Sequence, residues 1–97
     1  MPTYISLVKW TDQGIRNVKE SPARLDAATQ ATEAVGGKTI AFYLTMGRYD
    51  VVIISEYPND EAAATVLLGI ASRGNVRTET LRAFTEDQYR DVIAKIR

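Results

Sequence analysis

The segment Val51–Ile54 places four β-branched residues in an unbroken row, inside the longer stretch YDVVIISEY. β-branched residues favour strands, and side chains along a strand alternate between the two faces of its sheet. Val51 and Ile53 therefore point to one face, while Val52 and Ile54 point to the other. A strand of this kind needs apolar cover on both faces, which constrains the fold more than any other feature of the chain.

Three further segments have the β-branched and aromatic content of strands, namely 3–10, 38–46 and 76–84. The apolar strand itself spans 49–57 and ends before Pro58, because proline cannot donate a hydrogen bond to a sheet. Gly47-Arg48 separates it from the strand before and suits a two-residue hairpin turn of type II′. The chain therefore contains a hairpin at its centre.

Helical patterns lie between these strands. Apolar residues at spacings of three and four predict a short helix near 12–19 and a main helix near 22–35, with a kink or break between them. Gly36-Gly37 ends the main helix, because glycine tolerates the left-handed conformation that closes helices.

A later helix begins at Asn59 or Asp60, either of which can cap it. Gly69 lies inside this helix, at a cost of about 1 kcal/mol relative to alanine, and close packing against the sheet explains it best. Thr85 caps a last helix, with Gln88 completing a capping box. The apolar stripe of this last helix is short and consists of Tyr89, Val92, Ile93 and Ile96.

The order β-α-β-β-α-β plus a C-terminal helix predicts a ferredoxin-like α+β sandwich, with residues 1–97 as one domain. Its two main helices cover only one face of the four-stranded sheet. The other face would expose several large side chains among Tyr4, Val8, Trp10, Tyr43, Val51 and Ile53. Each would forgo about 1.5–3 kcal/mol in water. We therefore predict a homodimer, or a higher oligomer, whose sheets pack face to face as a dimeric α/β barrel.

The composition excludes several classes of function. The chain has no Cys and no His, which removes disulfides, iron–sulfur clusters, ordinary zinc sites and Ser–His catalysis. Basic and acidic residues balance at 12 each, which argues against nucleic acid or an anionic membrane as a partner. Apolar runs are too short to span a membrane, and no signal peptide is apparent. We expect a cytoplasmic protein without metal or cofactor.

Four polar residues form the candidate site. Asp50, beside the hairpin turn, either accepts backbone hydrogen bonds, pairs with an arginine, or acts as a general base. Tyr49 offers an apolar ring for packing and one hydroxyl for a ligand. Arg77 and Glu79 project to the same side of their strand. There they form either a surface ion pair or a site for an anionic ligand.

The stretch Tyr43–Phe84 closely resembles the GYD domain family, and the opening TYISLVKWTDQGIRNVKESPAR is similar to that family as well. The motifs are Gly-x-Tyr-Asp at Gly47, Tyr49 and Asp50, a Pro-x-Asp-Glu helix start, and a Gly-Asn-Val-Arg-Thr-Glu-Thr strand. The resemblance implies a dimeric, ferredoxin-like α/β-barrel domain of bacteria and archaea, without an agreed activity. The hairpin is also similar to effector-binding domains of leucine-responsive regulators, which bind small amino acids at subunit interfaces.

These features favour a small homodimeric protein that binds an organic or amino-acid-like ligand. We expect the pocket between sheet and helices or at the subunit interface, with Tyr49, Asp50, Arg77 and Glu79 as its polar groups. A cofactor-free enzyme, monooxygenase- or isomerase-like, is the first alternative and would depend on Asp50 or a tyrosine. A purely structural assembly module is the second.

Overall fold

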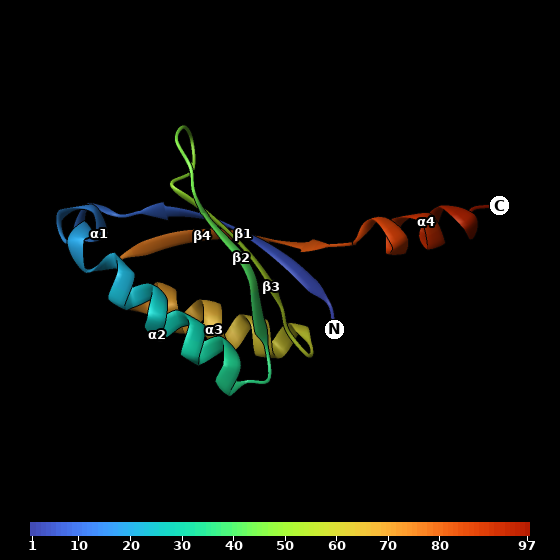
Figure 1. The fold of residues 1–97 in the computed structure, drawn as a ribbon, viewed down its shortest axis with the longest axis horizontal. Coiled ribbons are helices and arrows are strands. Elements are labelled where there is room, and N and C mark those ends of the chain that lie inside the picture. The colour runs from blue at the N-terminus through green and yellow to red at the C-terminus, as the bar shows by residue number, and fades with distance from the viewer.

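The computed structural model describes residues 1–97. Its elements are β1 (Thr3–Trp10), α1 (Asp12–Arg16), the 3-10 turn η1 (Val18–Glu20), α2 (Ser21–Ala34), β2 (Lys38–Leu44), β3 (Val51–Glu56), α3 (Asp60–Ser72), β4 (Val76–Ala83) and α4 (Glu86–Ala94). The strands form one antiparallel sheet in the order β2-β3-β1-β4, and α2 and α3 lie side by side under one face of it (Figure 1). This is the predicted ferredoxin-like α+β fold with an additional C-terminal helix.

The predicted break in the first helical region is confirmed, since η1 separates α1 from α2. Gly36 follows α2 with a φ of 83°, as expected for a glycine that closes a helix. Asn59 caps α3, and Thr85 and Gln88 form the predicted capping box of α4. Each of these features depends on residues that are close together in the sequence, so the sequence alone is enough to predict it.

The prediction of close packing at Gly69 is wrong, because a Cβ added there would meet no atom within 4 Å. Gly14 is the crowded glycine instead. A Cβ at Gly14 would lie 1.9 Å from the carbonyl oxygen of Asn75. The N–H of Thr11 donates to that same oxygen at 3.0 Å, which ties α1 to the loop before β4.

The two-residue turn predicted at Gly47-Arg48 is also wrong. β2 ends at Leu44 and β3 begins at Val51, so residues 45–50 connect them. The N–H of Thr45 donates to the carbonyl oxygen of Asp50 at 2.8 Å and closes this longer loop. The loop projects from the sheet on the side away from α2 and α3 (Figure 1).

Both faces of the sheet are apolar, as predicted, but the faces are exchanged. The helices cover the face that carries Tyr4, Ser6, Val8, Trp10, Val51, Ile53 and Ser55. The open face carries Ile5, Leu7, Val52, Ile54 and Leu81, together with Tyr43. Of the six residues predicted to be left uncovered, only Tyr43 lies on the open face. Strand alternation defines two sets of residues, but the handedness of the crossover between β1 and β2 decides which set the helices cover.

The buried core is small, and its largest contiguous cluster lies where β1 begins. This cluster consists of Tyr4, Tyr57, Ala63 and Val66. The rings of Tyr4 and Tyr57 meet edge to face, with 5.5 Å between centroids. The Tyr4 hydroxyl donates to Oδ1 of Asp60 in the first turn of α3. This end of the helix layer is therefore held firmly against the sheet.

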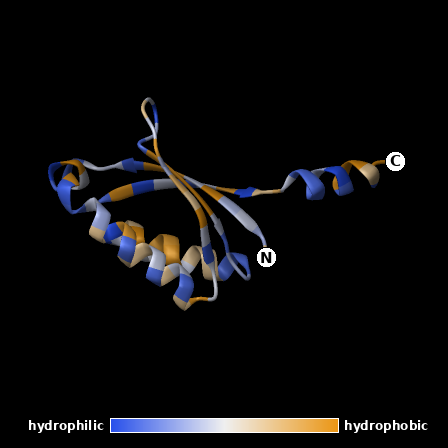
Figure 2. Cartoon of the chain, in the orientation of Figure 1, coloured by the Kyte–Doolittle hydropathy of each residue, from blue (hydrophilic) through white to orange (hydrophobic).

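The last helix, α4, continues outward from β4 and stands clear of the sheet and of α2 and α3 (Figure 1). Its apolar residues Tyr89, Val92 and Ile93 are exposed, as is Ile96 just after the helix. Figure 2 shows hydrophobic residues in the strands and toward the C-terminal end of the chain. The radius of gyration is 14.6 Å, against about 12.5 Å for a compact chain of this length. No helix has both the length and the hydropathy needed to cross a bilayer.

Candidate functional site

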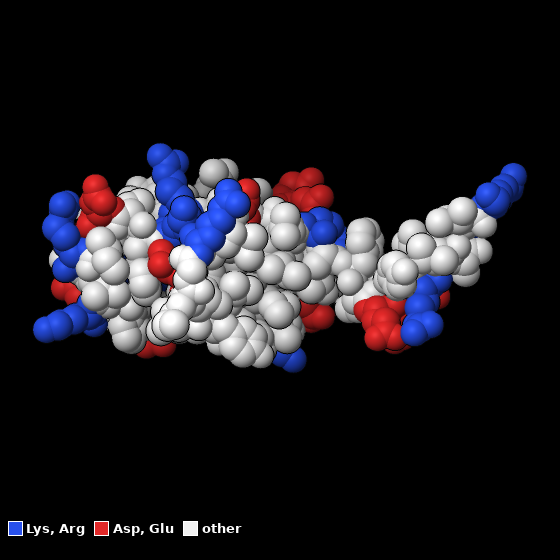
Figure 3. Space-filling view, turned by 90° about the horizontal axis from the view of Figure 1, so that it is seen from above, with Lys and Arg blue, Asp and Glu red and all other residues white.

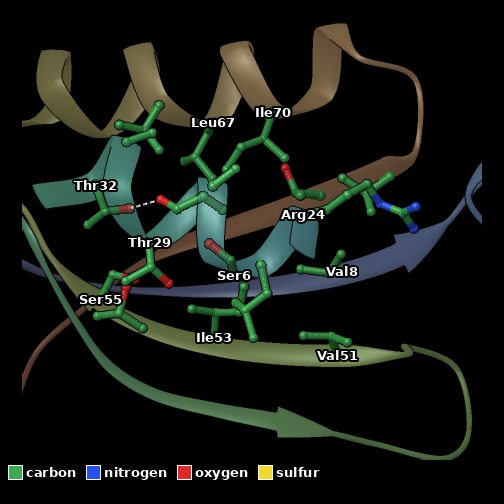
Figure 4. A pocket seen from close by; sticks show the side chains of 18 of the residues that line it. Ser6, Val8, Arg24, Thr29, Thr32, Val51, Ile53, Ser55, Leu67 and Ile70 are labelled. Atoms are coloured by element: carbon green, nitrogen blue, oxygen red, sulfur yellow. Dashed lines mark hydrogen bonds between the residues drawn. The ribbon is translucent and has the colours of Figure 1, made fainter. Parts of the chain in front are cut away.

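A cavity of about 660 Å³ lies between the sheet and the two helices α2 and α3. Figure 4 shows its walls, with Ser6, Val8, Val51, Ile53 and Ser55 from the strands and Leu67 and Ile70 from α3. The side chains that α2 contributes are mostly small: Ala27, Ala28, Thr29, Ala31, Thr32 and Ala34. A helix that faces a sheet with such residues leaves space where larger residues would normally fill the core. The cavity thus follows from the sequence of α2.

Hydroxyl groups provide most of the polar character of this cavity. Thr32 is buried, donates to the carbonyl oxygen of Ala28 at 3.0 Å and lies 3.2 Å from the hydroxyl of Tyr57. Ser6 shares a 3.0 Å hydrogen bond with Thr80 on β4. Thr29 of α2 and Ser55 of β3 approach each other at one end of the cavity (Figure 4). Hydroxyls can donate or accept, so these positions can bond either kind of ligand group.

Arg24 borders the opposite end of the cavity (Figure 4). Its guanidinium donates to the backbone oxygens of Asn17 at 3.0 Å and Gly14 at 3.3 Å. No carboxylate neutralises it, since the one ion pair of the structure joins Arg90 to Glu86. A half-buried guanidinium with neutral partners keeps its charge and its remaining N–H donors available for an anion.

A second, smaller hollow of about 280 Å³ lies on the open face of the sheet. Its polar lining includes Lys9, Arg48, Tyr49, Arg77 and Glu79. The Tyr49 hydroxyl donates to Oε2 of Glu79 at 2.5 Å. This hydrogen bond is the main cause of the raised pKa of Tyr49, followed by burial. We name this set the polar hollow.

The predicted site residues therefore separate into two groups. Tyr49, Arg77 and Glu79 come together in the polar hollow, where Glu79 bonds Tyr49 and forms no ion pair with Arg77. Asp50 lines neither the cavity nor the hollow. Its Oδ2 accepts a hydrogen bond from the backbone N–H of Trp10 at 2.9 Å. Of the three roles predicted for this carboxylate, the structure shows backbone hydrogen bonding.

Sequence reasoning did not identify the residues of the large cavity. Two signals for it are present. The segment DAATQATEA of α2 lacks large apolar residues, and Ser6 and Ser55 interrupt apolar strands on the covered face. No group of three or more acidic side chains is placed to hold a metal ion.

The sequence profile of the GYD domain matches residues 4–93. The chain is also similar to a protein of Thermus thermophilus named glutamine synthetase and cystathionine beta-lyase binding protein. The two are 35% identical over 98 residues, which cover all of both chains. This similarity therefore extends through α1 and α4 as well as the sheet.

Two solved structures are similar in fold. A crystal structure from Thermus thermophilus aligns with a TM-score of 0.55 and 28% identity, over 88% of this chain and 95% of that chain. A feast or famine regulatory protein of M. tuberculosis, complexed with L-methionine, aligns with a TM-score of 0.53 and 20% identity. The second alignment covers 91% of this chain and 55% of that chain, and it shows a shared fold.

Proposed function

The chain belongs to the GYD domain family, and from this premise we propose that it is a homodimer that binds a small organic ligand between its sheet and helices. The cavity of about 660 Å³ is the observation that carries the proposal. Ligand sites commonly enclose about 300–1,000 Å³, with mostly apolar walls and a few directed polar groups. This cavity has that size and that composition.

The ligand class follows from the distribution of polar groups. The middle of the cavity is apolar, with Val8, Ile53 and Ile70 among its walls. Arg24 provides a positive charge at one end, and Thr29 and Ser55 provide hydroxyls at the other. An apolar molecule with a carboxylate or similar anionic group at one end matches both features.

The homodimer is supported by the open face. Leu81 and Tyr43 are exposed there, beside the half-buried side chains of Ile5, Leu7, Val52 and Ile54. A monomer that left this face in water would carry a larger apolar patch than soluble proteins usually show. A second copy of the chain offers a matching face by symmetry.

The polar hollow gives a second place for an amino-acid-like ligand, at the edge of that open face. Glu79 suits an ammonium group, while Arg77 and Lys9 suit a carboxylate. Tyr49 orients Glu79 through its hydroxyl. In this arrangement Asp50 acts indirectly, because it holds β3 beside β1 at the edge of the hollow.

A screen by thermal unfolding tests the cavity. Long-chain and aromatic carboxylic acids are compared with their neutral amides and with free amino acids. A ligand at 100 times its Kd stabilises the folded state by about 2.7 kcal/mol, or roughly 10–20 °C in Tm for a domain of this size. A screen in which no carboxylic acid raises the Tm would count against an anionic ligand.

Two variants of α2 locate the binding site. Ala28→Phe fills the cavity, whereas Ala23→Phe adds the same ring to an exposed position of the same helix outside the cavity. We expect the ligand-induced rise in Tm to disappear in the first and persist in the second. Equal responses of the two variants would place the ligand elsewhere, with the polar hollow as the next position to test through Glu79→Gln.

Binding of partner enzymes is a second candidate function. The full-length relative at 35% identity is named for binding glutamine synthetase and cystathionine beta-lyase. Sedimentation of this protein with purified glutamine synthetase and cystathionine beta-lyase from its own source organism tests this function. If this protein sediments independently of both enzymes in mixtures at micromolar concentrations, partner-enzyme binding is rejected.

A further inference from the structure

Two parts of the chain project from the body with exposed apolar side chains. The first is the hairpin loop at 45–50, where Met46 is 98% exposed. The second is α4 with the residues that follow it, where Tyr89 is 58% exposed and Ile96 is 68% exposed. Each large apolar side chain left in water forgoes about 1.5–3 kcal/mol. The apolar side chains of both projections would therefore be stabilised by contact with another molecule, since their own protomer does not bury them.

The two projections cannot cover each other within one chain. Pairing of Thr3 with Ala83 places the start of α4 at the beginning of β1. Pairing of Val8 with Val51 places the hairpin loop near the other end of β1. About eight residues of strand, or roughly 25 Å, separate them. Figure 1 shows the loop and α4 leaving the sheet at different places and in different directions.

A two-fold axis brings them together. When two sheets stack face to face with their strands antiparallel, the hairpin end of each lies over the α4 end of the other. The hairpin projects from the open face (Figure 1), so it points toward the partner at the place where the partner's α4 begins. The same contact forms twice, once at each end of the stack.

Charge favours this stacking over the parallel one. Lys9, Arg48 and Arg77 surround the polar hollow at the hairpin end. Figure 3, which views the molecule from the side of the open face, shows Lys and Arg gathered over part of this face. If the strands of the two sheets were parallel, the basic residues of one protomer would face the same basic residues of its partner. Antiparallel stacking sets these basic residues near Glu86 and Asp87 in the first turn of the partner's α4.

The contact area also favours a contribution from the C-terminal arm. The sheet has four strands, and at a spacing of about 4.8 Å and a length of about 26 Å its face covers roughly 500 Å². A stable dimer buries about 800 Å² on each partner. α4 has 9 residues, so it is about 13 Å long and about 10 Å wide. Each protomer contacts its partner through its own α4 and also receives the partner's α4. Together these two contacts add roughly 260 Å² to each protomer, which is close to the difference between the sheet face and the area of a stable dimer.

We infer that, in the homodimer of the proposed function, α4 of each protomer docks against the 45–50 hairpin of the second copy. The apolar stripe of α4 covers Met46, and its acidic first turn faces Arg48. The occupant of this surface is a second copy of this chain. The inference rests on the proposed homodimer and adds its register and the role of the C-terminal helix.

Disulfide trapping tests the contact directly, because the chain has no native Cys. A Met46→Cys/Ile93→Cys double variant is oxidised at micromolar concentration and covalent dimer is followed on a non-reducing gel. The matched control is Leu68→Cys/Ile93→Cys, since Leu68 is an exposed apolar residue on α3. We expect the first pair to form dimer at least roughly ten-fold faster, because docking raises the effective concentration of the two thiols.

Sedimentation of the unmodified chain separates the possible outcomes. Equal trapping rates in the two double variants, with a dimer present, would overturn the docking of α4 and leave the homodimer standing. A monomer at micromolar concentration would overturn both. A truncation that ends at Thr85 provides a second measure, for which we expect a dimer dissociation constant at least roughly ten-fold higher. An unchanged constant would contradict the inference.

Discussion

Oδ2 of Asp50 accepts a hydrogen bond from the backbone N–H of Trp10 at 2.9 Å. The backbone N–H of Asp50 donates in turn to the carbonyl oxygen of Val8 at 2.9 Å. The carboxylate thereby stands where a strand carbonyl would otherwise pair, and it extends the contact between β1 and β3 by one step. This explains why an acidic residue directly precedes the most apolar strand of the chain.

Asp50→Ala should destabilise the fold by about 1–3 kcal/mol, because the partly buried N–H of Trp10 loses its acceptor. Asp50→Asn should cost less, since its amide oxygen still accepts. Urea unfolding of the two variants measures the difference. Equal losses in Asn and Ala would show that the charge, and not the hydrogen bond, matters at this position.

Tyr4 should make stability depend on alkaline pH. Burial, and next its hydrogen bond to Asp60, raise the pKa of Tyr4 from 10.0 to about 12 in the folded state. The folded protein then holds this proton more tightly than the unfolded chain. The contribution is complete below pH 10 and is lost as the pH rises through about 12. Unfolding free energy should therefore fall across this window.

A phenylalanine variant isolates the effect of Tyr4. Tyr4→Phe should be less stable at neutral pH but should lose less stability between pH 10 and pH 12. Parallel slopes for the parent and Tyr4→Phe would contradict the assignment.

Gly69 and Gly14 should respond oppositely to alanine. Gly69 lies inside α3 with open space at the position of a Cβ, so Gly69→Ala should stabilise by about 0.5–1 kcal/mol. In Gly14→Ala the new Cβ would clash with backbone at 1.9 Å, and the overpacking should cost about 1–3 kcal/mol or more. Thermal and urea unfolding measure both. A destabilising Gly69→Ala would show that another group occupies that space.

Glu79 should control the ionisation of Tyr49. The hydrogen bond to Glu79 raises the pKa of Tyr49, and the negative charge of Glu79 adds to the effect. Glu79→Gln should therefore lower that pKa toward its ordinary value, while Glu56→Gln, elsewhere on the sheet, should leave it unchanged. Titration of the Tyr49 ring carbon by NMR checks this. A pKa unaffected by Glu79→Gln would mean that the two side chains part in solution.

Local signals in the sequence predicted much of the fold. The capping box at Thr85, the closing glycine at Gly36 and the break before α2 depend on neighbours within a few residues, and they are present in the structure. The prediction of a two-residue hairpin turn is wrong because Thr45 and Asp50 close a longer loop. Hydrogen bonds of both residues, including the long-range bond to Trp10, stabilise this alternative.

The sequence by itself determined that the sheet is apolar on both faces, because alternation along Val51–Ile54 allows no other result. It also brought Tyr49, Arg77 and Glu79 into consideration, and these residues share one hollow. Only the tertiary structure decided which face the helices cover and that a cavity remains beneath α2. Those outcomes depend on the handedness of the crossover and on the summed volumes of residues far apart in the chain.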